Sequence, residues 1–348
     1  MTTRTPNRQK QSNDSPPRHG LALIFPGQGS QHPGMGKRLA EISQAAREMF
    51  AQADEVLAVK ISDLCFEGTE EQLGETENTQ PALLTTSLAH LAFLRERLQE
   101  FGHRLAPGLI AGHSLGQYSA AVASDSLDFS DGLRLVQERG RIMADWATKH
   151  PGGLAAVLGL DEEIVRQVCS DSSRDGAVGV AVVNCPGQTV ISGESEPLER
   201  AMDLARERGG KVRRLPISVP SHIPLMREAA KELSGFIDKL PFRDPNPPLV
   251  SNISSKLLTT AEEVRKELSD QISSTIEWAR CVLAMADHGS SPFIEVGPGK
   301  ALTNLMKRIR GDIEVFTAET ASGAQLLDLA GSVPAKQRER TLAGDATQ

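Results

Sequence analysis

The sequence predicts an α/β fold in which a smaller unit of βαββαβ order is inserted into a larger one. Three stretches support this prediction: the apolar run at residues 21–25, the strand-turn-helix pattern at residues 109–123, and the alternating strand and helix patterns over residues 154–218. Short apolar runs bounded by turn residues are typical of the buried strands of a parallel sheet. The expected division is a large unit of residues 20–147 and 219–320 and a small unit of residues 148–218.

The composition is that of an ordinary soluble globular protein. Of the 348 residues, 39% are hydrophobic and 24% charged, and the net charge of −7 argues against a nucleic-acid partner or an anionic membrane surface. No apolar run reaches membrane-spanning length. The scattered cysteines lack metal-binding or disulfide spacing, so we expect a reducing, cytoplasmic location and no metal centre. These cysteines are Cys65, Cys169, Cys185 and Cys281.

Both ends of the chain are predicted to be disordered tails. Residues 1–19 are polar and basic and lack the apolar segment of a secretory signal. Residues 321–348 mix small and charged side chains, with one short helix expected at residues 325–329.

The large unit opens with the strand at residues 21–25, which ends in the turn Pro26-Gly-Gln-Gly-Ser-Gln31. Ligands bind at the carboxyl ends of strands in open α/β sheets, although the same glycines also suit a purely structural turn. The next apolar patterns predict an interrupted helix at 35–59, helices at 82–101 and 131–146, and a strand at 109–111.

The residues Gly112-His113-Ser114-Leu115-Gly116 form a G-x-S-x-G pattern between that strand and a helix rich in small residues. In a nucleophile elbow the serine occupies a strained turn, and the flanking glycines let strand and helix approach closely. The helix start also directs N–H groups toward the place where an oxyanion would form. Ser114 is therefore a candidate nucleophile, with an ordinary turn serine as the alternative.

The small unit follows Pro151-Gly-Gly153, and its pattern is the split βαββαβ of ferredoxin-like folds. Its expected elements are strands at 154–160, 177–183, 189–192 and 211–218 and helices at 161–169 and 197–208. Such an insertion would lie over the elbow and form a cleft. The large unit then resumes with strands at 248–251 and 292–296 and helices at 262–270, 271–286 and 301–310.

Two histidines compete for the role of a base. His222 lies in the Pro-bounded loop Val219-Pro-Ser-His-Ile-Pro224, directly after the last strand of the small unit. His113 adjoins Ser114 in the chain and is expected to point away from it. A lone histidine is more often structural than catalytic, but the rigid loop at the junction of the two units favours His222.

Seven motifs in this order resemble those of bacterial malonyl-CoA:acyl carrier protein transacylases and the related acyltransferase domains of polyketide synthases. They are Phe25-Pro-Gly-Gln-Gly-Ser-Gln31, Gln80-Pro-Ala82, Gly112-His-Ser-Leu-Gly116, Arg139-Gly140, Asn184-Cys-Pro-Gly-Gln188, Val219-Pro-Ser-His222 and Glu295-Val-Gly-Pro-Gly-Lys300. The resemblance covers residues 21–310 and implies an α/β-hydrolase-like domain with a ferredoxin-like insertion, as the patterns predict.

The resemblance also implies roles for individual residues. Ser114 would be the nucleophile and His222 the general base, with the histidine held by a backbone carbonyl at Gln271 rather than by a carboxylate. The backbone N–H groups of Gln28 and Leu115 would form the oxyanion hole. Asn184 and the side chain of Gln28 are further substrate-binding candidates.

Arg139 would bind the free carboxylate of a malonyl group, because a guanidinium can donate to both carboxylate oxygens. Helical arginines are more often solvated, which is the alternative for Arg139 as for Arg134 and Arg141. The implied reaction is a ping-pong transfer from malonyl-CoA to the phosphopantetheine thiol of an acyl carrier protein in fatty acid synthesis, with no cofactor and a monomeric enzyme.

One position departs from the family pattern. Gln117 stands where the family usually has Glu, and we expect this change to tune activity rather than abolish it. Carrier proteins are acidic, so an acidic enzyme needs a local basic surface to bind one. The candidates, for each of which a solvated helix face is an equal alternative, are Arg206, Arg208, Lys211, Arg213 and Arg214 in the small unit and Lys300, Lys307, Arg308 and Arg310 in the large one.

Three other functions stay open. A thioester hydrolase would use the same Ser114 and His222 with water as the acceptor, but has no need of a carboxylate-binding Arg139. A polyketide-pathway acyltransferase would take another carboxylated acyl unit. A non-catalytic subunit that only binds carrier protein would have no use for the intact Ser114, His222, Gln28 and Arg139.

Overall fold

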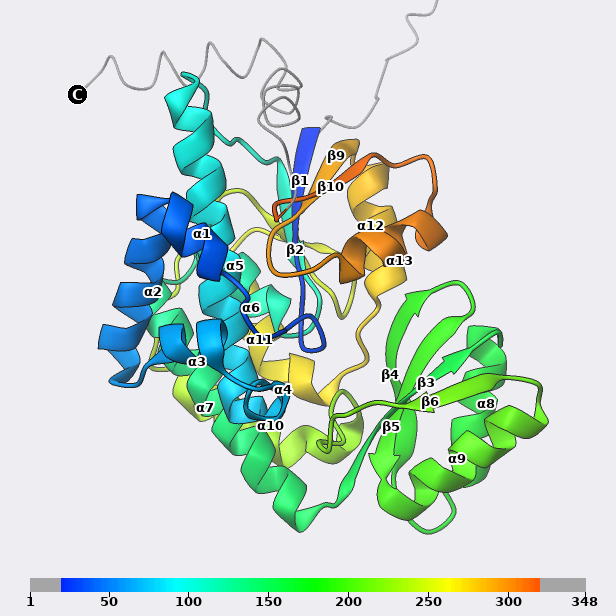
Figure 1. Cartoon of the computed structure of the whole chain (residues 1–348). Coiled ribbons are helices and arrows are strands. Elements are labelled where there is room, and N and C mark those ends of the chain that lie inside the picture. Colours follow the sequence, from blue (N-terminus) through cyan, green and yellow to red (C-terminus); the bar gives the residue numbers. More distant parts are fainter. Residues whose placement is uncertain (1–19, 320–348) are drawn as a thin grey trace, which may run out of the picture.

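The computed structural model describes residues 20–319, and its strands form two separate sheets (Figure 1). The predicted tails, including the helix at 325–329, lie outside the described residues. The larger sheet contains, in spatial order, β10 (Val315–Thr317), β9 (Ser290–Glu295), β1 (Gly20–Phe25), β2 (Leu109–Gly112), β7 (Leu249–Val250) and β8 (Leu257–Leu258). Its strands pair in parallel except for β7 and β8. The α/β prediction is confirmed.

Both faces of the larger sheet are buried because its strands present apolar residues to both sides. In β1, Leu21, Leu23 and Phe25 join one cluster of buried side chains, whereas Ala22 and Ile24 join another. The first cluster is covered by α1 (Lys37–Ile42), α2 (Gln44–Leu57), α3 (Ile61–Glu67), α4 (Glu70–Gly74), α5 (Thr76–Glu100), α6 (Gly116–Ala123), α7 (Phe129–Lys149), α10 (Arg227–Ile237) and α11 (Ala261–Asp270). The second is covered by α12 (Trp278–Asp287) and α13 (Ala301–Ile309).

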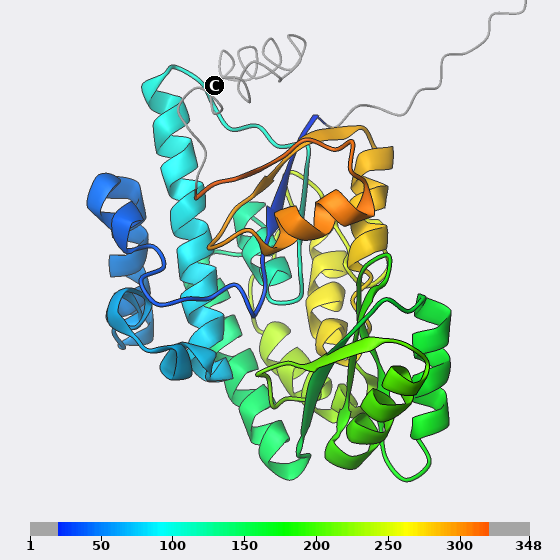
Figure 2. The ribbon, with the colours of Figure 1, turned by 45° about the vertical axis from the view of Figure 1, so that its right-hand side comes forward.

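The smaller sheet has the predicted βαββαβ order. Its elements are β3 (Gly152–Leu158), α8 (Glu162–Ser172), β4 (Val178–Cys185), β5 (Gln188–Glu194), α9 (Ser195–Glu207) and β6 (Lys211–Arg214). The spatial order β4-β5-β3-β6, antiparallel throughout, is that of a ferredoxin-like sheet. Figures 1 and 2 show this unit beside the large one, next to α12 and α13.

The helix predicted at residues 271–286 is only partly right. Residues Gln271–Ser273 form a single 3₁₀ turn (η2), and the helix begins at Trp278. The residues between them are drawn into the small sheet: Ile276 N–H donates to Ala181 O at 2.8 Å, and Ile276 O accepts from Val183 N–H at 2.8 Å. Pairing with a distant strand therefore replaces the helical hydrogen bonds.

Other helix and strand boundaries also differ from the predicted ones. Helix α5 begins at Thr76 and contains Pro81, because deep burial of this segment outweighs the one hydrogen bond that the proline removes. Strand β6 ends at Arg214, before Pro216, rather than at Ser218. The predictions did not include α3, α4, α10, β8, β10 or the 3₁₀ turn η1 (Pro224–Met226).

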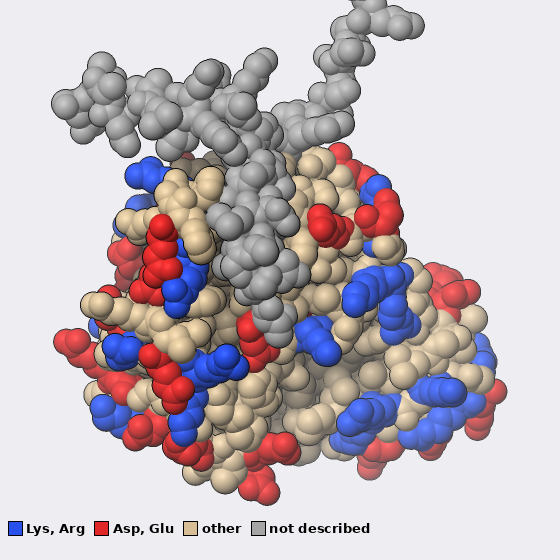
Figure 3. Space-filling model, turned by 45° about the horizontal axis from the view of Figure 1, so that its top comes forward, with Lys and Arg blue, Asp and Glu red and all other residues tan. Residues whose placement is uncertain are grey.

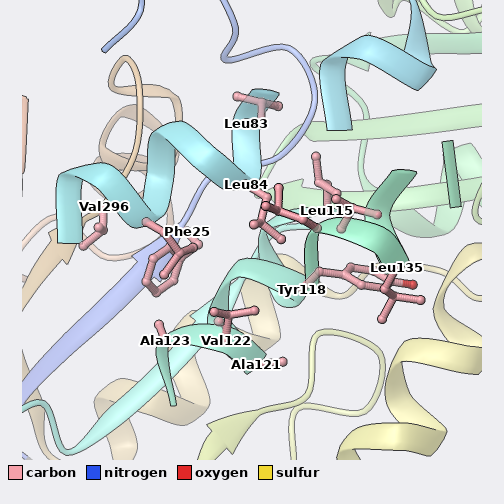
Figure 4. Close-up of a cluster of buried hydrophobic side chains, with 14 of the residues drawn as sticks. Phe25, Leu83, Leu84, Leu115, Tyr118, Ala121, Val122, Ala123, Leu135 and Val296 are labelled. Atoms are coloured by element: carbon pink, nitrogen blue, oxygen red, sulfur yellow. The ribbon is translucent and has the colours of Figure 1, made fainter. Parts of the chain in front are cut away.

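A cluster of buried apolar side chains packs against the strand-turn-helix segment at residues 109–123. Figure 4 shows Phe25 of β1, Leu84 of α5, Tyr118 and Val122 of α6 and Leu135 of α7 gathered in it. Helix α6 is buried along its whole length, which anchors the turn before it. No helix within residues 20–319 is long and apolar enough to cross a membrane.

Candidate active site

The turn after β2 has the geometry of a nucleophile elbow. Ser114 has a positive φ of 50°, a strained conformation for a residue with a side chain. Gly112 and Gly116 allow it, because a Cβ on Gly112 would overlap the backbone of Gly116, and a Cβ on Gly116 would overlap the Phe25 carbonyl. Glycines thus let α6 lie against the ends of β1 and β2, and Ser114 is presented at that edge.

His222 meets Ser114 from the loop that follows the small unit. The Ser114 hydroxyl donates to His222 Nε2 at 2.7 Å, and His222 Nδ1–H donates to Gln271 O at 3.0 Å. The carbonyl acceptor requires a proton on Nδ1, which leaves the lone pair of Nε2 for the serine proton. The backbone of His222 is also strained, with φ 65°, and its N–H donates to Ile272 O at 2.8 Å. Both anchors of His222 belong to η2.

Arg139 of α7 is buried, only 1% exposed, instead of being solvated. Its Nη1 donates to Gln80 Oε1 at 2.7 Å, and its Nη2 lies 3.5 Å from Ser114 Oγ and 3.4 Å from Gln271 Oε1. The guanidinium also lies over the Tyr118 ring. Within residues 20–319 these partners are all neutral and Nε has none, so a buried cation next to Ser114 lacks a counter-ion. Arg134 and Arg141 form exposed ion pairs, as helical arginines usually do.

The electrostatics favour a neutral histidine. Burial, and secondarily the charge of Arg139, lower the pKa of His222 to about 3. Burial also lowers the pKa of His113, whose Nε2–H donates to Asn184 Oδ1 at 2.9 Å. His113 therefore points away from Ser114, and Asn184 of β4 contacts the elbow through it.

The proposed oxyanion donors lie on adjacent turns. Gln28 follows β1 and Leu115 follows Ser114, and β1 and β2 are parallel neighbours whose carboxyl ends share one edge of the sheet. Neither backbone N–H finds an acceptor among residues 20–319. Gln271 contacts the same turn, since its Nε2 donates to the backbone carbonyl of Ser114 at 2.9 Å.

A cavity of about 1090 Å³ opens beside this cluster, between the two units. Gln28 and Glu77 line it from the large unit, Ser195 lines it from the small unit, and Val219 lines it from the connection between them. Ser114, His222 and Arg139 do not line it; of the candidate site residues, Gln28 does. Among the described residues, no group of three or more His, Cys, Asp or Glu side chains is placed to hold a metal ion.

Gln117 lies beneath the elbow rather than facing the cavity. Its Oε1 accepts from Gly112 N–H at 2.7 Å and its Nε2 donates to Val250 O at 3.0 Å, both in the interior. An amide satisfies both groups, whereas an ionised carboxylate could only accept. Gln117 therefore connects the elbow to β7.

Two residues of this cluster were absent from the predicted set. Gln80 belongs to the quoted Gln-Pro-Ala motif, and its side-chain oxygen accepts a hydrogen bond from Arg139. Asn252 follows β7, and its Nδ2 donates to Gly112 O at 2.7 Å. A polar residue after a predicted strand was the available signal for Asn252.

Known proteins resemble this chain over most of its length. The family model described as acyl transferase domain matches residues 22–339. The malonyl CoA-acyl carrier protein transacylase of Bacillus subtilis is 42% identical over 309 residues, which is 88% of this chain and 95% of that protein.

Solved structures also resemble this chain. The malonyl-CoA:acyl carrier protein transacylase of Xanthomonas oryzae pv. oryzae has a TM-score of 0.84 and 39% identity, covering 90% of this chain and 98% of that one. A malonyl-transacylase solved in complex with its type II polyketide synthase acyl-carrier protein has a TM-score of 0.83 and 36% identity, covering 90% and 99%. This chain therefore belongs to the acyl transferase domain family, and it is an acyltransferase.

Proposed function

We propose that this protein transfers a malonyl group from malonyl-CoA to the phosphopantetheine thiol of an acyl carrier protein through an ester on Ser114. The observation that carries the proposal is the buried Arg139, which has no carboxylate partner among residues 20–319 and lies 3.5 Å from Ser114 Oγ. A malonyl thioester presents a carboxylate close to its reactive carbonyl, so one group can reach Arg139 while the other reaches Ser114. The names of the similar proteins support the same substrate.

Each half of the reaction uses the same pair of residues. Ser114 Oγ attacks the thioester carbonyl as His222 Nε2 takes its proton, and the oxyanion is stabilised by the N–H groups of Gln28 and Leu115. The intermediate collapses, the C–S bond breaks, and the proton passes from His222 to the departing CoA thiolate. In the second half, His222 deprotonates the carrier thiol, which attacks the ester, and the proton returns to Ser114 Oγ.

Arg139 supplies selectivity in this scheme. An acetyl group would leave the buried guanidinium without a counter-ion, whereas a malonyl carboxylate can accept two hydrogen bonds from it. Asn184 of the small unit accepts a hydrogen bond from His113, and we propose that it lines one side of the acyl site. The residues described supply nucleophile, base and oxyanion donors, so we propose that the reaction needs no cofactor and is completed within one monomer.

The four cysteines are free and buried, which suits the reducing cytoplasm that we propose as the location. Fatty acid synthesis is the pathway we favour. One of the similar structures belongs to a type II polyketide system, and an acyl unit other than malonyl is therefore the second candidate.

The test is the intact mass of the protein after mixing with malonyl-CoA, with and without holo acyl carrier protein. We expect a malonyl adduct that persists in water and moves to the carrier, and no adduct on Ser114→Ala. An adduct that never accumulates while CoA and malonate build up would identify a hydrolase. Labelling by a branched malonyl-CoA but not by malonyl-CoA would assign the polyketide-type substrate, and labelling of Ser114→Ala would overturn the elbow assignment.

A further inference from the structure

Asn252 joins the two parts of the site that hold the nucleophile and the base. It follows β7, which pairs with β2, and its side chain is fully buried. Its Nδ2 donates to Gly112 O at 2.7 Å, two residues before Ser114. Its Oδ1 accepts from Gln271 Nε2 at 3.4 Å, and that same nitrogen donates to Ser114 O at 2.9 Å.

Gln271 extends this connection to the base, because its backbone carbonyl accepts from His222 Nδ1. The Asn252 amide therefore lies between the strand that carries Ser114 and the turn that orients His222. Only one orientation of the amide satisfies both neighbours, since Gly112 O requires a donor and Gln271 Nε2 requires an acceptor. Asn252 touches no reacting atom.

The backbone of Asn252 is itself fixed from two helices. Its N–H donates to the buried Glu267 carboxylate at 2.8 Å, and its carbonyl accepts from Glu277 N–H at 2.7 Å. The neighbouring Ser251 hydroxyl donates to the same Glu267 carboxylate at 2.6 Å. Helix α11 and the start of α12 thus hold the residue in place, and this rigidity allows its side chain to set the distance between two loops.

We propose that Asn252 is a positioning residue. It keeps the Ser114 elbow and the turn η2, which orients His222, at the separation that acylation requires. The inference rests on the proposed acylation of Ser114. Loss of the Asn252 amide would leave Gly112 O unpaired and free Gln271 to shift, and a shift of about 1 Å between nucleophile and base costs on the order of a hundredfold in rate.

Substitution by aspartate provides a signature that ordinary destabilisation would not produce. A protonated aspartic acid side chain at this position is close to isosteric with asparagine, since its hydroxyl can donate to Gly112 O and its carbonyl oxygen can accept from Gln271. An ionised carboxylate would instead face the Gly112 carbonyl with a negative oxygen. The Asn252→Asp variant should therefore regain activity relative to the native protein as the pH falls and the carboxyl takes up a proton.

The experiment measures single-turnover acylation by malonyl-CoA between about pH 4.5 and about pH 8, for native protein, Asn252→Ala and Asn252→Asp. We expect the acylation rate constant to fall about 10- to 100-fold in Asn252→Ala at every pH, with the half-saturating concentration of malonyl-CoA changed less than about threefold. Relative to the native protein, Asn252→Asp should lose as much acylation rate as Asn252→Ala at the alkaline end of the range. This loss should become smaller toward the acid end. A pH-independent deficit in Asn252→Asp, or acylation of Asn252→Ala at the native rate, would overturn the proposal.

Two controls separate the possible failures. Ser126→Ala removes the hydrogen bond from a buried hydroxyl to Arg243 O, outside the network that holds Asn252, and should lower the unfolding temperature with acylation within about twofold of native. An equal loss of rate in Ser126→Ala would show that the loss of stability alone explains the Asn252 result. Labelling of Ser114 by a fluorophosphonate repeats the pH series without malonyl-CoA. If the native protein accepts the fluorophosphonate but not malonyl-CoA, the proposed substrate is wrong, and the Asn252 series still decides the positioning role.

Discussion

We propose that Arg139 determines substrate choice, and its charge also affects the pKa of the proposed base, His222. It lies near Ser114 Oγ and Gln271 Oε1, and its charge is one of the causes that lower the pKa of His222. A cation disfavours protonation of a neighbouring imidazole, so the native histidine stays neutral, and able to accept a proton, far below neutral pH. The other titratable group beside it, His113, is itself held neutral by burial, which lowers its pKa.

Replacing Arg139 by methionine removes one of these causes and leaves burial, the larger one. The pKa of His222 should rise from about 3 toward its ordinary value of 6.5, so the base is lost at a higher pH as the solution is acidified. The acid limb of fluorophosphonate labelling should therefore move upward in Arg139→Met. Arg134→Met, at an exposed arginine on the same helix, is the matched control. An unchanged acid limb in Arg139→Met would contradict this electrostatic coupling.

At the level of elements, the elbow depends on how closely α6 approaches β1 and β2. A Cβ on Gly116 would overlap the backbone carbonyl of Phe25, which cannot rotate away as a side chain would. In contrast, Gly235 lies in α10 with nothing within 4 Å of where its Cβ would be. Close packing therefore requires glycine at the first position and not at the second.

Alanine substitutions at these two positions should have opposite effects on the free energy of unfolding. Gly116→Ala should destabilise by about 2 kcal/mol or more, because the backbone of the elbow must move. Gly235→Ala should stabilise by about 0.5–1 kcal/mol, because alanine favours the helix and lowers the entropy of the unfolded chain. Urea unfolding measures both. A Gly116→Ala protein as stable as the native one would refute the close packing described at the elbow.

For the whole molecule, the contacts between the small unit and α12 fix the small unit beside the candidate site. The bridge between Ile276 and β4 and the ion pairs among Glu162, Arg166, Glu277 and Arg280 hold it against α12. Figure 3 shows Lys and Arg side chains gathered on the right of the molecule, over the small unit and the neighbouring helices. Several predicted docking residues are already engaged there: Arg206, Arg208, Arg214 and Arg310 in ion pairs, and Arg308 with Gln188 and Pro186.

The exposed candidates without an ion pair in the described chain are Lys211, Arg213, Lys300 and Lys307. We expect charge reversal at Arg213 and Lys307 together to raise the KM for acyl carrier protein about three- to tenfold at low salt and to leave the KM for malonyl-CoA within about twofold. High salt should diminish the difference, and Arg134→Glu is the control. A change of both constants in parallel, or of neither, would place carrier docking elsewhere.

Local patterns alone determined much of this protein. The strand at residues 21–25, the G-x-S-x-G turn and the βαββαβ order follow from apolar runs and glycines adjacent in the chain, because burial and close backbone approach impose their demands on consecutive residues. The family resemblance placed Ser114, His222 and Gln271 among the site residues, and the structure brings these three into contact.

Only the tertiary structure decided the rest. Residues 274–277 leave the predicted helix because β4 offers them backbone partners. Arg139 is buried because Gln80 and Gln271 supply acceptors from other helices and turns, which helical periodicity cannot reveal. Asn252 joins the site through bonds to residues 140 and 19 positions away in the chain. Hydrogen bonds between such distant residues exist only after the sheet has assembled, so the sequence names the participants and the fold determines their partners.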